Sequence, residues 1–241
     1  MSELACRRLE DEAHADAYAE ILSLCFGSKP DQARQWVDRG RWENVRLLCR
    51  DGRVLGGLFV IPMGQWWGGS SVPMVGVGGV AVDPAERADG GATLLMQDVV
   101  QELHREGVAL STLFPATQPV YRRAGYEQAG LHFRVRVNTG RLFTSERTLD
   151  IRRATDADRA EIERLHRAHG QENDGNIDRS ELYWSFIREP LDDRTHSFVV
   201  EGHGGITGYV CYTSKTNSTG HQDLHVCDLV ARTPAAARRL L

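Results

Sequence analysis

The stretch VGVGGVAVDPAERADGGATLLMQDVVQELHREG, residues 75–107, decides the fold of this chain. It begins with an apolar run from Val75 to Val82, which is typical of a buried strand, and glycines in that run let another backbone or a ligand approach closely. Pro84 ends the strand, because proline cannot continue a central ladder. Apolar side chains then recur at helical spacing after Gly91.

The turn between this strand and this helix is suited to holding an anion. A helix N-terminus leaves several backbone N–H groups without intrahelical partners and carries about half a positive charge. Gly90 and Gly91 lack the Cβ atoms that would keep a phosphate away from those groups. The stretch therefore predicts a strand, a tight turn that cradles a pyrophosphate, and an amphipathic helix.

Two blocks of sequence resemble the GNAT superfamily of acyl-CoA-dependent N-acyltransferases. The spacing Arg87-x-x-Gly90-x-Ala92 is similar to the family's R/Q-x-x-G-x-G/A signature. Residues 115–126, PATQPVYRRAGY, are similar to its Y-x-x-x-G-Y/F segment. A lone glycine turn more often marks an ordinary helix start. Both blocks in the expected order, each preceded by a strand pattern, favour the GNAT interpretation.

The composition is that of a globular protein without a basic face. The chain has 241 residues, is 41% hydrophobic and 26% charged, and carries a net charge of −4. This balance argues against nucleic acid and against an anionic membrane as partners. The N-terminus is too charged for a secretory signal, and no apolar run reaches the length of a membrane span.

Cysteine and histidine usage predicts a cytoplasmic protein without a metal site. The five cysteines are odd in number and form no C-x-x-C pair, which favours reduced thiols over a disulfide framework or a zinc site. The pairs His166/His169 and His221/His225 have no acidic or cysteine cluster beside them in sequence, so we interpret them as surface residues.

Residues 1–140 are predicted to form one domain. The patterns indicate strands at 5–9, 45–49, 54–61, 72–82, 110–114 and 132–137, and helices at 11–25, 30–37 and 117–124 besides the helix after Gly90. The resemblance implies that this order is one GNAT domain, an α/β fold (α+β, with a mixed sheet) that binds acetyl-CoA.

Residues 141–149 look like a polar connector, after which 150–241 repeat the first half of the pattern. We expect strands at 149–153, 198–200, 207–212 and 224–230, and helices at 156–169, 182–187 and from Thr233 onward. No glycine opens the last helix, and Pro234 removes an amide donor there. The prediction is a second, degenerate and incomplete GNAT-like unit that binds no CoA. We expect it to bury Leu224, Val226, Leu229 and Val230.

This two-unit layout resembles the Eis-type (enhanced intracellular survival) branch of the GNAT acetyltransferases. Members of that branch carry two fused GNAT units and a third, sterol-carrier-like unit, which this sequence lacks. The resemblance implies a fragment or a shortened relative, and a possible homo-oligomer.

The resemblance also implies roles for particular residues. The acetyl-CoA site would consist of Val80, Val82, Arg87, Ala88, Gly90, Gly91 and Ala92. Tyr121 matches the family's general acid, and a neutral phenol can protonate a thiolate. Alternatively, Tyr121 and Tyr126 are core aromatics, and we prefer this interpretation for Tyr126. The alternative for Arg87 is a solvent-exposed side chain on the turn that contacts no ligand. Asp89 would repel a phosphate.

Aromatic side chains are candidates for the pocket of a cationic amine. We look first at Phe26 and Trp36, and then at Trp66 and Trp67, because aromatic faces attract cations. Core or interface positions are the alternative. In Eis-type enzymes the general base is the chain's own C-terminal carboxylate, which the third unit delivers. The general base is therefore unassigned in this sequence, and Glu43, Asp51 and solvent are unranked candidates for it.

The leading hypothesis is an acetyl-CoA-dependent N-acetyltransferase. By resemblance, it would acetylate a primary amine, an aminoglycoside-like polyamine or a lysine, by direct attack in a ternary complex. A non-catalytic CoA-binding or assembly module is the alternative, favoured by the missing base and by Asp89. A Rossmann nucleotide site at Gly76-x-Gly78-Gly79 is disfavoured, because these glycines lie within a strand and do not open a helix.

Overall fold

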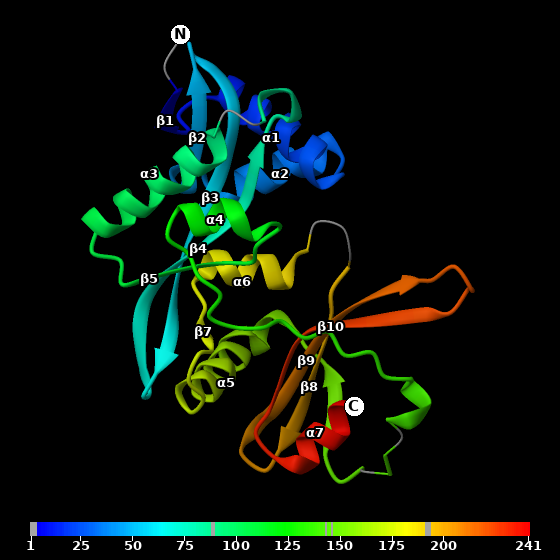
Figure 1. The fold of residues 1–241 in the computed structure, drawn as a ribbon. Coiled ribbons are helices and arrows are strands. Elements are labelled where there is room, and N and C mark those ends of the chain that lie inside the picture. The colour runs from blue at the N-terminus through cyan, green and yellow to red at the C-terminus, as the bar shows by residue number, and fades with distance from the viewer. Residues whose placement is uncertain (1–3, 88–89, 143, 146, 191–193) are drawn as a thin grey trace. The chain divides into compact units, whose positions relative to one another are not determined.

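The structure is a computed structural model that describes residues 4–87, 90–142, 144–145, 147–190 and 194–241 (Figure 1). The chain divides into two compact units. The first comprises Met1–Gly64, Val72–Gly130 and Arg179–Tyr183, and the second Gln65–Ser71, Leu131–Asp178 and Trp184–Leu241.

The first unit is built on a mixed sheet with the strand order β1-β2-β3-β4-β5. The strands are β1 (Leu4–Arg8), β2 (Val45–Arg50), β3 (Arg53–Trp67), β4 (Ser70–Val82) and β5 (Leu110–Leu113). β1 and β3 pair antiparallel with β2, whereas β4 and β5 are parallel. A parallel pair needs a crossover, which a helix between β4 and β5 supplies.

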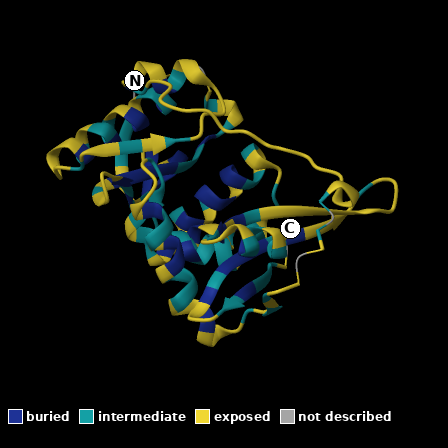
Figure 2. Ribbon diagram, turned by 90° about the horizontal axis from the view of Figure 1, so that it is seen from below, coloured by how far each residue is buried: buried dark blue, intermediate teal, exposed yellow. Residues whose placement is uncertain are grey.

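Helices cover both faces of this sheet (Figure 1). They are α1 (Glu12–Phe26), α2 (Pro30–Gly40), α3 (Gly91–Arg105) and α4 (Gln118–Arg123), with short 3-10 turns at Trp42–Asn44 and Pro84–Glu86. Alternation along β2 shows the two layers: Val45 and Leu47 join the core under α1 and α2, and Leu48 joins the core under α3 and α4. Figure 2 shows the buried residues on the strands and on the inward helix faces.

The starts and ends of the helices follow from local chemistry. The Asp11 carboxylate accepts the His14 N–H at 2.8 Å and caps α1, and Gly27 ends that helix at φ +69°. Pro30 occupies the first turn of α2. The predicted helices 11–25 and 30–37 are therefore confirmed, with α2 three residues longer than expected.

The second unit carries an antiparallel sheet in the order β10-β9-β8-β6. Its strands are β6 (Asp150–Arg153), β8 (His196–Gly202), β9 (Gly205–Thr216) and β10 (Gln222–Ala231), besides the short β7 (Ile177–Asp178). Its helices are α5 (Arg159–Gln171) and α7 (Pro234–Leu240), with 3-10 turns at Thr139–Arg141 and Asp156–Asp158; α6 (Glu181–Arg188) spans the division between the units. Leu165, Val199, Tyr209 and Val230 lie in its core.

One predicted strand is wrong. Residues 132–137 alternate apolar and polar side chains, yet they form no strand, and Phe133 and Val135 are 77% and 80% exposed. Alternation produces a strand only where a neighbouring strand supplies backbone partners. No strand in the described ranges pairs with this segment.

Two expectations about burial are also wrong. His166 is not a surface residue: it is 7% exposed, its Nε2 lies 3.2 Å from the Ile177 carbonyl, and its Nδ1 lies 3.3 Å from the Tyr209 hydroxyl. On β10, Val230 is buried, but Leu224, Val226 and Leu229 are 52%, 48% and 36% exposed. Leu224 and Val226 are two residues apart and therefore share one face of β10, and that face is exposed at these positions.

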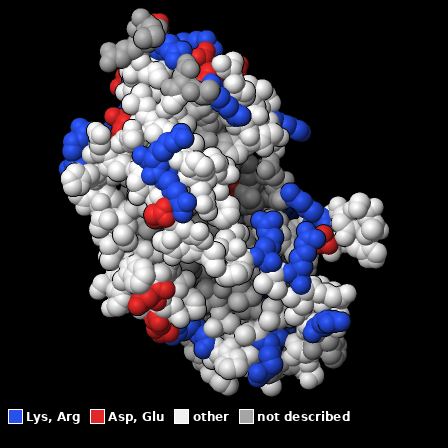
Figure 3. Space-filling view, viewed as in Figure 1, with Lys and Arg blue, Asp and Glu red and all other residues white. Residues whose placement is uncertain are grey.

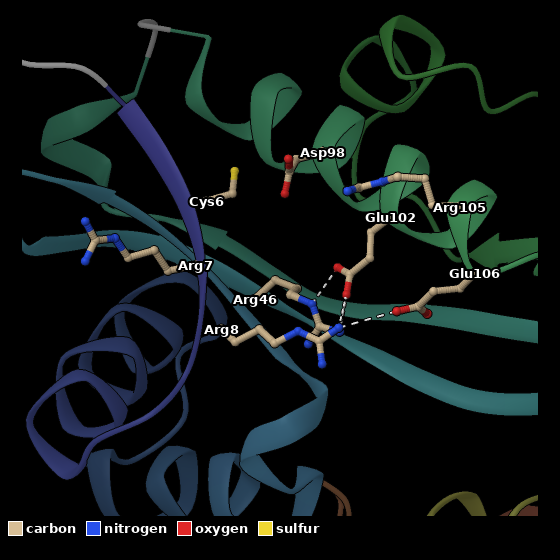
Figure 4. Close-up of a pocket in the computed structure, with 8 residues that line it drawn as sticks. All are labelled: Cys6, Arg7, Arg8, Arg46, Asp98, Glu102, Arg105 and Glu106. Atoms are coloured by element: carbon tan, nitrogen blue, oxygen red, sulfur yellow. Dashed lines mark hydrogen bonds and ion pairs between the residues drawn. The ribbon is translucent and has the colours of Figure 1, made fainter.

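An ion pair fastens α3 to the sheet. Arg46 of β2 donates to both carboxylate oxygens of Glu102 at 2.7 and 2.8 Å, and their side chains are 8% and 14% exposed. Arg8 also pairs with Glu102, and it reaches Glu106 at 3.4 Å (Figure 4). These guanidinium hydrogen bonds, the Arg46 bond above all, hold the pKa of Glu102 below its usual range.

The same residues line a hollow of about 460 Å³ between β1, β2 and α3 (Figure 4). Its lining is Cys6, Arg7, Arg8, Arg46, Asp98, Glu102, Arg105 and Glu106. Burial, together with the Asp98 carboxylate, raises the pKa of Cys6 to about 12, so this thiol stays protonated. The hollow lies along the C-terminal half of α3, at the opposite end from the glycine turn.

We expect Glu102→Gln to lower the free energy of unfolding by about 3 kcal/mol, because Arg46 stays buried without its counter-charge. Glu106→Gln is the matched control: its partner Arg8 is exposed, so it should cost less than about 1 kcal/mol. Urea unfolding of the three proteins measures both values.

The pH dependence follows from the lowered pKa of Glu102. A depressed folded-state pKa contributes stability above the unfolded-state value, and that contribution is lost as the pH falls below about 4. Wild type should therefore lose its advantage over Glu102→Gln in that range. An equal gap at pH 7 and pH 3 would contradict the assignment.

Candidate functional site

The site predicted from the sequence lies where β4 extends beyond its parallel neighbour. The β4–β5 register runs from Met74↔Leu110 to Val77↔Leu113, and β5 ends there. β4 continues for five more residues, to Val82. Past Val77, the backbone edge of β4 on the β5 side is not covered by β5, so it can pair with an extended ligand.

The N-terminus of α3 meets the requirements of an anion cradle. Gly90 adopts φ +77° and caps the helix without a side-chain hydrogen bond. A Cβ at Gly90 would meet nothing within 4 Å among the residues that the structure describes. The first helical hydrogen bond runs from Leu94 N–H to the Gly90 carbonyl, at 3.0 Å. The amides of residues 91–93 precede that bond and lack intrahelical acceptors, so they suit a phosphate.

The two glycines of the turn have different roles. A Cβ at Gly91 would lie 2.6 Å from Cδ2 of Leu48, in the core under α3. Gly91 is therefore required for close packing of α3 on β2, whereas Gly90 leaves open space over the helix end. The sequence placed both glycines in the cradle without separating these functions.

Arg87 folds back over the end of β4. Its Nε donates to the Val82 carbonyl at 3.3 Å, and its Nη2 lies 3.3 Å from Sγ of Cys25. A guanidinium has five N–H donors, so this bracing leaves donors for a phosphate. Ala88, the neighbouring predicted cofactor residue, and Asp89 lie outside the described residues.

Four predicted residues come together in one apolar cluster. Val82 and Tyr121 are buried in the core under α3 and α4, and Val80 and Ala92 pack against it. Elements far apart in the sequence thus bring the β4 edge, the start of α3 and the tyrosine of α4 into one neighbourhood. This is the grouping that the two sequence blocks implied.

The two tyrosines of the YRRAGY block have different surroundings. Tyr121 lies on α4 and is 8% exposed, and burial raises the pKa of its phenol, so it remains protonated near neutral pH. The Tyr126 hydroxyl lies 2.6 Å from Oγ of Ser111 on β5. Burial raises the pKa of Tyr126 as well. The Ser111 contact supports a packing role for Tyr126.

The aromatic candidates for the amine pocket are dispersed. Phe26 at the end of α1 and Trp36 on α2 are 59% and 44% exposed. Trp36 packs edge-on against Phe59 with the ring centroids 6.4 Å apart. Trp66 is instead a core residue of the second unit, 4% exposed, and its indole lies against Gly170. Trp67 is 49% exposed and donates to Gln65 at 3.0 Å.

Both candidate bases lie on exposed turns. Glu43 lies in an exposed 3-10 turn before β2. Asp51 lies at the exposed β2–β3 turn with φ +51°. Their positions do not assign the general base.

Two residues of the first unit escaped the sequence interpretation. Tyr18 of α1 donates its hydroxyl to the Gly79 carbonyl at 2.8 Å, and the ring of Phe59 lies against Gly79. The signal that could have found them is Gly78-Gly79, a glycine pair inside a strand, which indicates close approach of other groups.

The second unit presents a different helix start at the equivalent place. The Thr233 hydroxyl already accepts the Ala236 N–H at 3.1 Å, and Pro234 occupies the first turn of α7. One N–H of this helix start is already capped by a side chain and Pro234 has no N–H, so few donors remain for a phosphate.

No metal cluster and no membrane helix emerge from the residues that the structure describes. They include no group of three or more His, Cys, Asp or Glu side chains arranged around an ion. None of their helices combines the length and apolar character that crossing a bilayer demands. All five cysteines are described, and none forms a disulfide. On the face drawn in Figure 3, basic side chains occur at several separate places with acidic ones among them.

The fold of the first unit and the residues around the start of α3 can be compared with known protein families. Family models described as GNAT acetyltransferase domains match residues 6–129 and 175–241. The chain belongs to the GNAT acetyltransferase family, whose members use acetyl-CoA as acetyl donor. The predicted GNAT fold with a second GNAT-like unit is confirmed, and no curated protein matches the sequence.

Several solved structures resemble the chain over nearly its whole length. A GCN5-related N-acetyltransferase from Anabaena variabilis is 28% identical with a TM-score of 0.88, covering 98% of this chain and 61% of its own. One from Kribbella flavida is 27% identical with a TM-score of 0.78, covering 99% and 60%. Eis1 from Mycobacterium abscessus shares the fold at 21% identity and a TM-score of 0.70, covering 99% and 61%. The chain thus spans about three fifths of these relatives.

We expect Gly90→Glu to abolish acetyl-CoA binding, because its side chain places bulk and negative charge over the amides that face the pyrophosphate. Gly107→Glu is a matched control at the other end of α3: that glycine also has positive φ (+72°) and open space around it. Calorimetric titration should show unchanged affinity in the control. Full affinity in Gly90→Glu would exclude this turn as the cradle.

We expect one acetyl-CoA per chain, because the start of α7 is already capped. The stoichiometry from titration of the whole chain measures this. A second site of similar affinity that survives Gly90→Glu would show that residues 150–241 hold a working cradle.

Proposed function

We propose that the protein is an acetyl-CoA-dependent N-acetyltransferase of the Eis-like, two-GNAT-unit branch, acting on a primary amine. The observation that carries the proposal is the conjunction at the end of β4: an extending strand edge, an open helix N-terminus at Gly90, and a buried protonated phenol at Tyr121. Aminoglycoside-like polyamines and lysine side chains are the acceptor classes that the resemblance favours.

Each part of this conjunction has a task in acyl transfer. The backbone at Val80 and Val82 binds the pantetheine amides as an added strand would. The amides from Gly90 to Ala92 hold the pyrophosphate, with Arg87 beside it and with Ala88 as a further donor by resemblance. This anchoring brings the thioester to the tyrosine and removes the entropy cost of a collision.

The reaction is a direct displacement in a ternary complex. The neutral amine attacks the thioester carbonyl, a C–N bond forms, and the C–S bond breaks as the tetrahedral intermediate collapses. The amine loses a proton to a base that the described groups do not identify, and the leaving thiolate takes the Tyr121 proton. Solvent then reprotonates the phenolate.

For the acceptor, we propose the aromatic side chains of Phe26 and Trp36. Both are exposed, and Trp36 connects through Phe59 to the backbone of β4 at Gly79. A cationic amine is attracted to such faces. We also propose a cytoplasmic enzyme with one GNAT unit in residues 1–140 and a degenerate unit in 150–241, and the resemblance supports a homo-oligomer.

A non-catalytic CoA-binding module is the rival, and the unassigned general base favours it. Thiol release from acetyl-CoA in the presence of a polyamine panel separates the two functions. Tight acetyl-CoA binding without amine-dependent thiol release from any acceptor would favour the module.

We expect Tyr121→Phe to keep acetyl-CoA affinity and to lower kcat by about 10²–10⁴, the usual loss on removing a general acid. Tyr126→Phe, which loses only its contact with Ser111, should stay active. Steady-state kinetics of both variants test the assignment, and the opposite pattern would show that Tyr126 is the acid.

A further inference from the structure

Gly79 in β4 is contacted by Tyr18 of α1, from the face of the sheet opposite α3. Gly79 adopts φ +60°, a conformation that other residues rarely take. The Tyr18 hydroxyl donates to its carbonyl at 2.8 Å. Tyr18 is fully buried on α1, 61 residues away in sequence. A single phenol thus fixes the peptide between Gly79 and Val80.

Fixing that carbonyl also fixes the next amide. No peptide bond in the described chain is cis. In a trans peptide the carbonyl of one residue and the N–H of the next lie in one plane and point in opposite directions. Since the Gly79 carbonyl points to Tyr18, the Val80 N–H points away from α1. Val80 itself packs against the cluster that contains Tyr121.

Close packing around the ring of Tyr18 restrains its hydroxyl, which can therefore fix the position of the Gly79 carbonyl. A Cβ at Gly57 would lie 2.8 Å from the Tyr18 ring, so Gly57 makes room for that ring. Phe59 packs on Tyr18 with centroids 5.6 Å apart, and its edge lies 2.6 Å from the Cβ position of Gly79. Burial keeps the pKa of Tyr18 well above its ordinary value, so the hydroxyl remains a donor.

We propose that Tyr18 is a positioning residue that holds the Gly79–Val80 peptide so that the Val80 N–H is presented to the thioester carbonyl oxygen of the acetyl donor. This rests on the proposed function. Tyr18 touches no substrate and acts through Val80. A preoriented N–H stabilises the oxygen most when negative charge develops there. Without the hydroxyl, a glycine-flanked peptide is free to rotate.

Tyr18→Phe tests the proposal, because it keeps the ring between Gly57 and Phe59 and removes the donor. We expect kcat to fall about 10-fold, less than the 10²–10³ typical of deleting an oxyanion donor itself. KM for acetyl-CoA should change less than about 2-fold, because the cradle at Gly90 is untouched. Tyr126→Phe loses a tyrosine hydroxyl in the same unit and should leave kcat unchanged.

A spectroscopic readout does not depend on turnover. Infrared difference spectra of bound acetyl-CoA labelled with ¹³C at the thioester carbonyl report the hydrogen bond to that oxygen. Wild type should shift the carbonyl stretch below its solution value, and Tyr18→Phe should move it back toward solution. Replacing Tyr18 with p-aminophenylalanine keeps a weaker donor and should give an intermediate frequency. That variant carries the test if Tyr18→Phe does not fold.

The outcomes separate this proposal from the proposed function. Equal kcat and equal carbonyl frequency in wild type and Tyr18→Phe would overturn the role of Tyr18. Wild type that binds acetyl-CoA but acetylates no amine would overturn the transferase proposal, and the carbonyl frequencies would still decide the role of Tyr18. Wild type that binds no acetyl-CoA would overturn both.

Discussion

The parting of β4 from β5 after Val77 is the constraint on which the rest of the first unit depends. Two parallel strands that end at different lengths leave backbone groups of the longer one without that neighbour. In a closed sheet this would be a defect, because buried amides and carbonyls require partners. Here the crossover helix α3 begins beside the same strand end, so its own unpaired amides lie near the uncovered edge of β4. In the proposed function, the extended and anionic acetyl-CoA supplies partners for both sets of groups.

Keeping that edge in place requires support from elements on both faces of the sheet. On one face, Tyr18 and Phe59 contact Gly79. Near the end of β4, the side chains of Arg87 and Cys25 donate to the Val82 carbonyl. On the other, Gly91 lets α3 pack against Leu48, and the Arg46–Glu102 ion pair fastens the far end of the same helix. Gly90 is exposed, whereas Gly91, the first residue of α3, is buried. A helix fixed along its length can present its N-terminus rigidly, which is what preorganised binding of a phosphate needs.

The second unit has a different kind of helix start after its last strand. β10 also leads directly into a helix, but Thr233 caps that helix and Pro234 takes its first position. Its sheet is antiparallel throughout, so no parallel pair parts beside the helix. The interior of this unit instead contains a polar group, in which Tyr209 donates to Asp228 at 2.8 Å and lies beside His166. The family resemblance of this half therefore lies in its fold and not in a cradle.

By itself, the sequence determined the family and the order of most elements, because strand and helix periods, caps and the two motif blocks are local properties. The anion cradle at the start of α3 stays a prediction. The sequence also located the turn signals: Asp11, Pro30 and Thr233 start helices where expected. Only the tertiary structure decided that Gly90 has open space beside it and that Gly91 packs against Leu48. It also decided that residues 132–137 form no strand, that His166 and Trp66 are buried, and that Tyr18 reaches Gly79. Each of these depends on which group from a distant element fills the neighbouring space, and no local period or spacing encodes that.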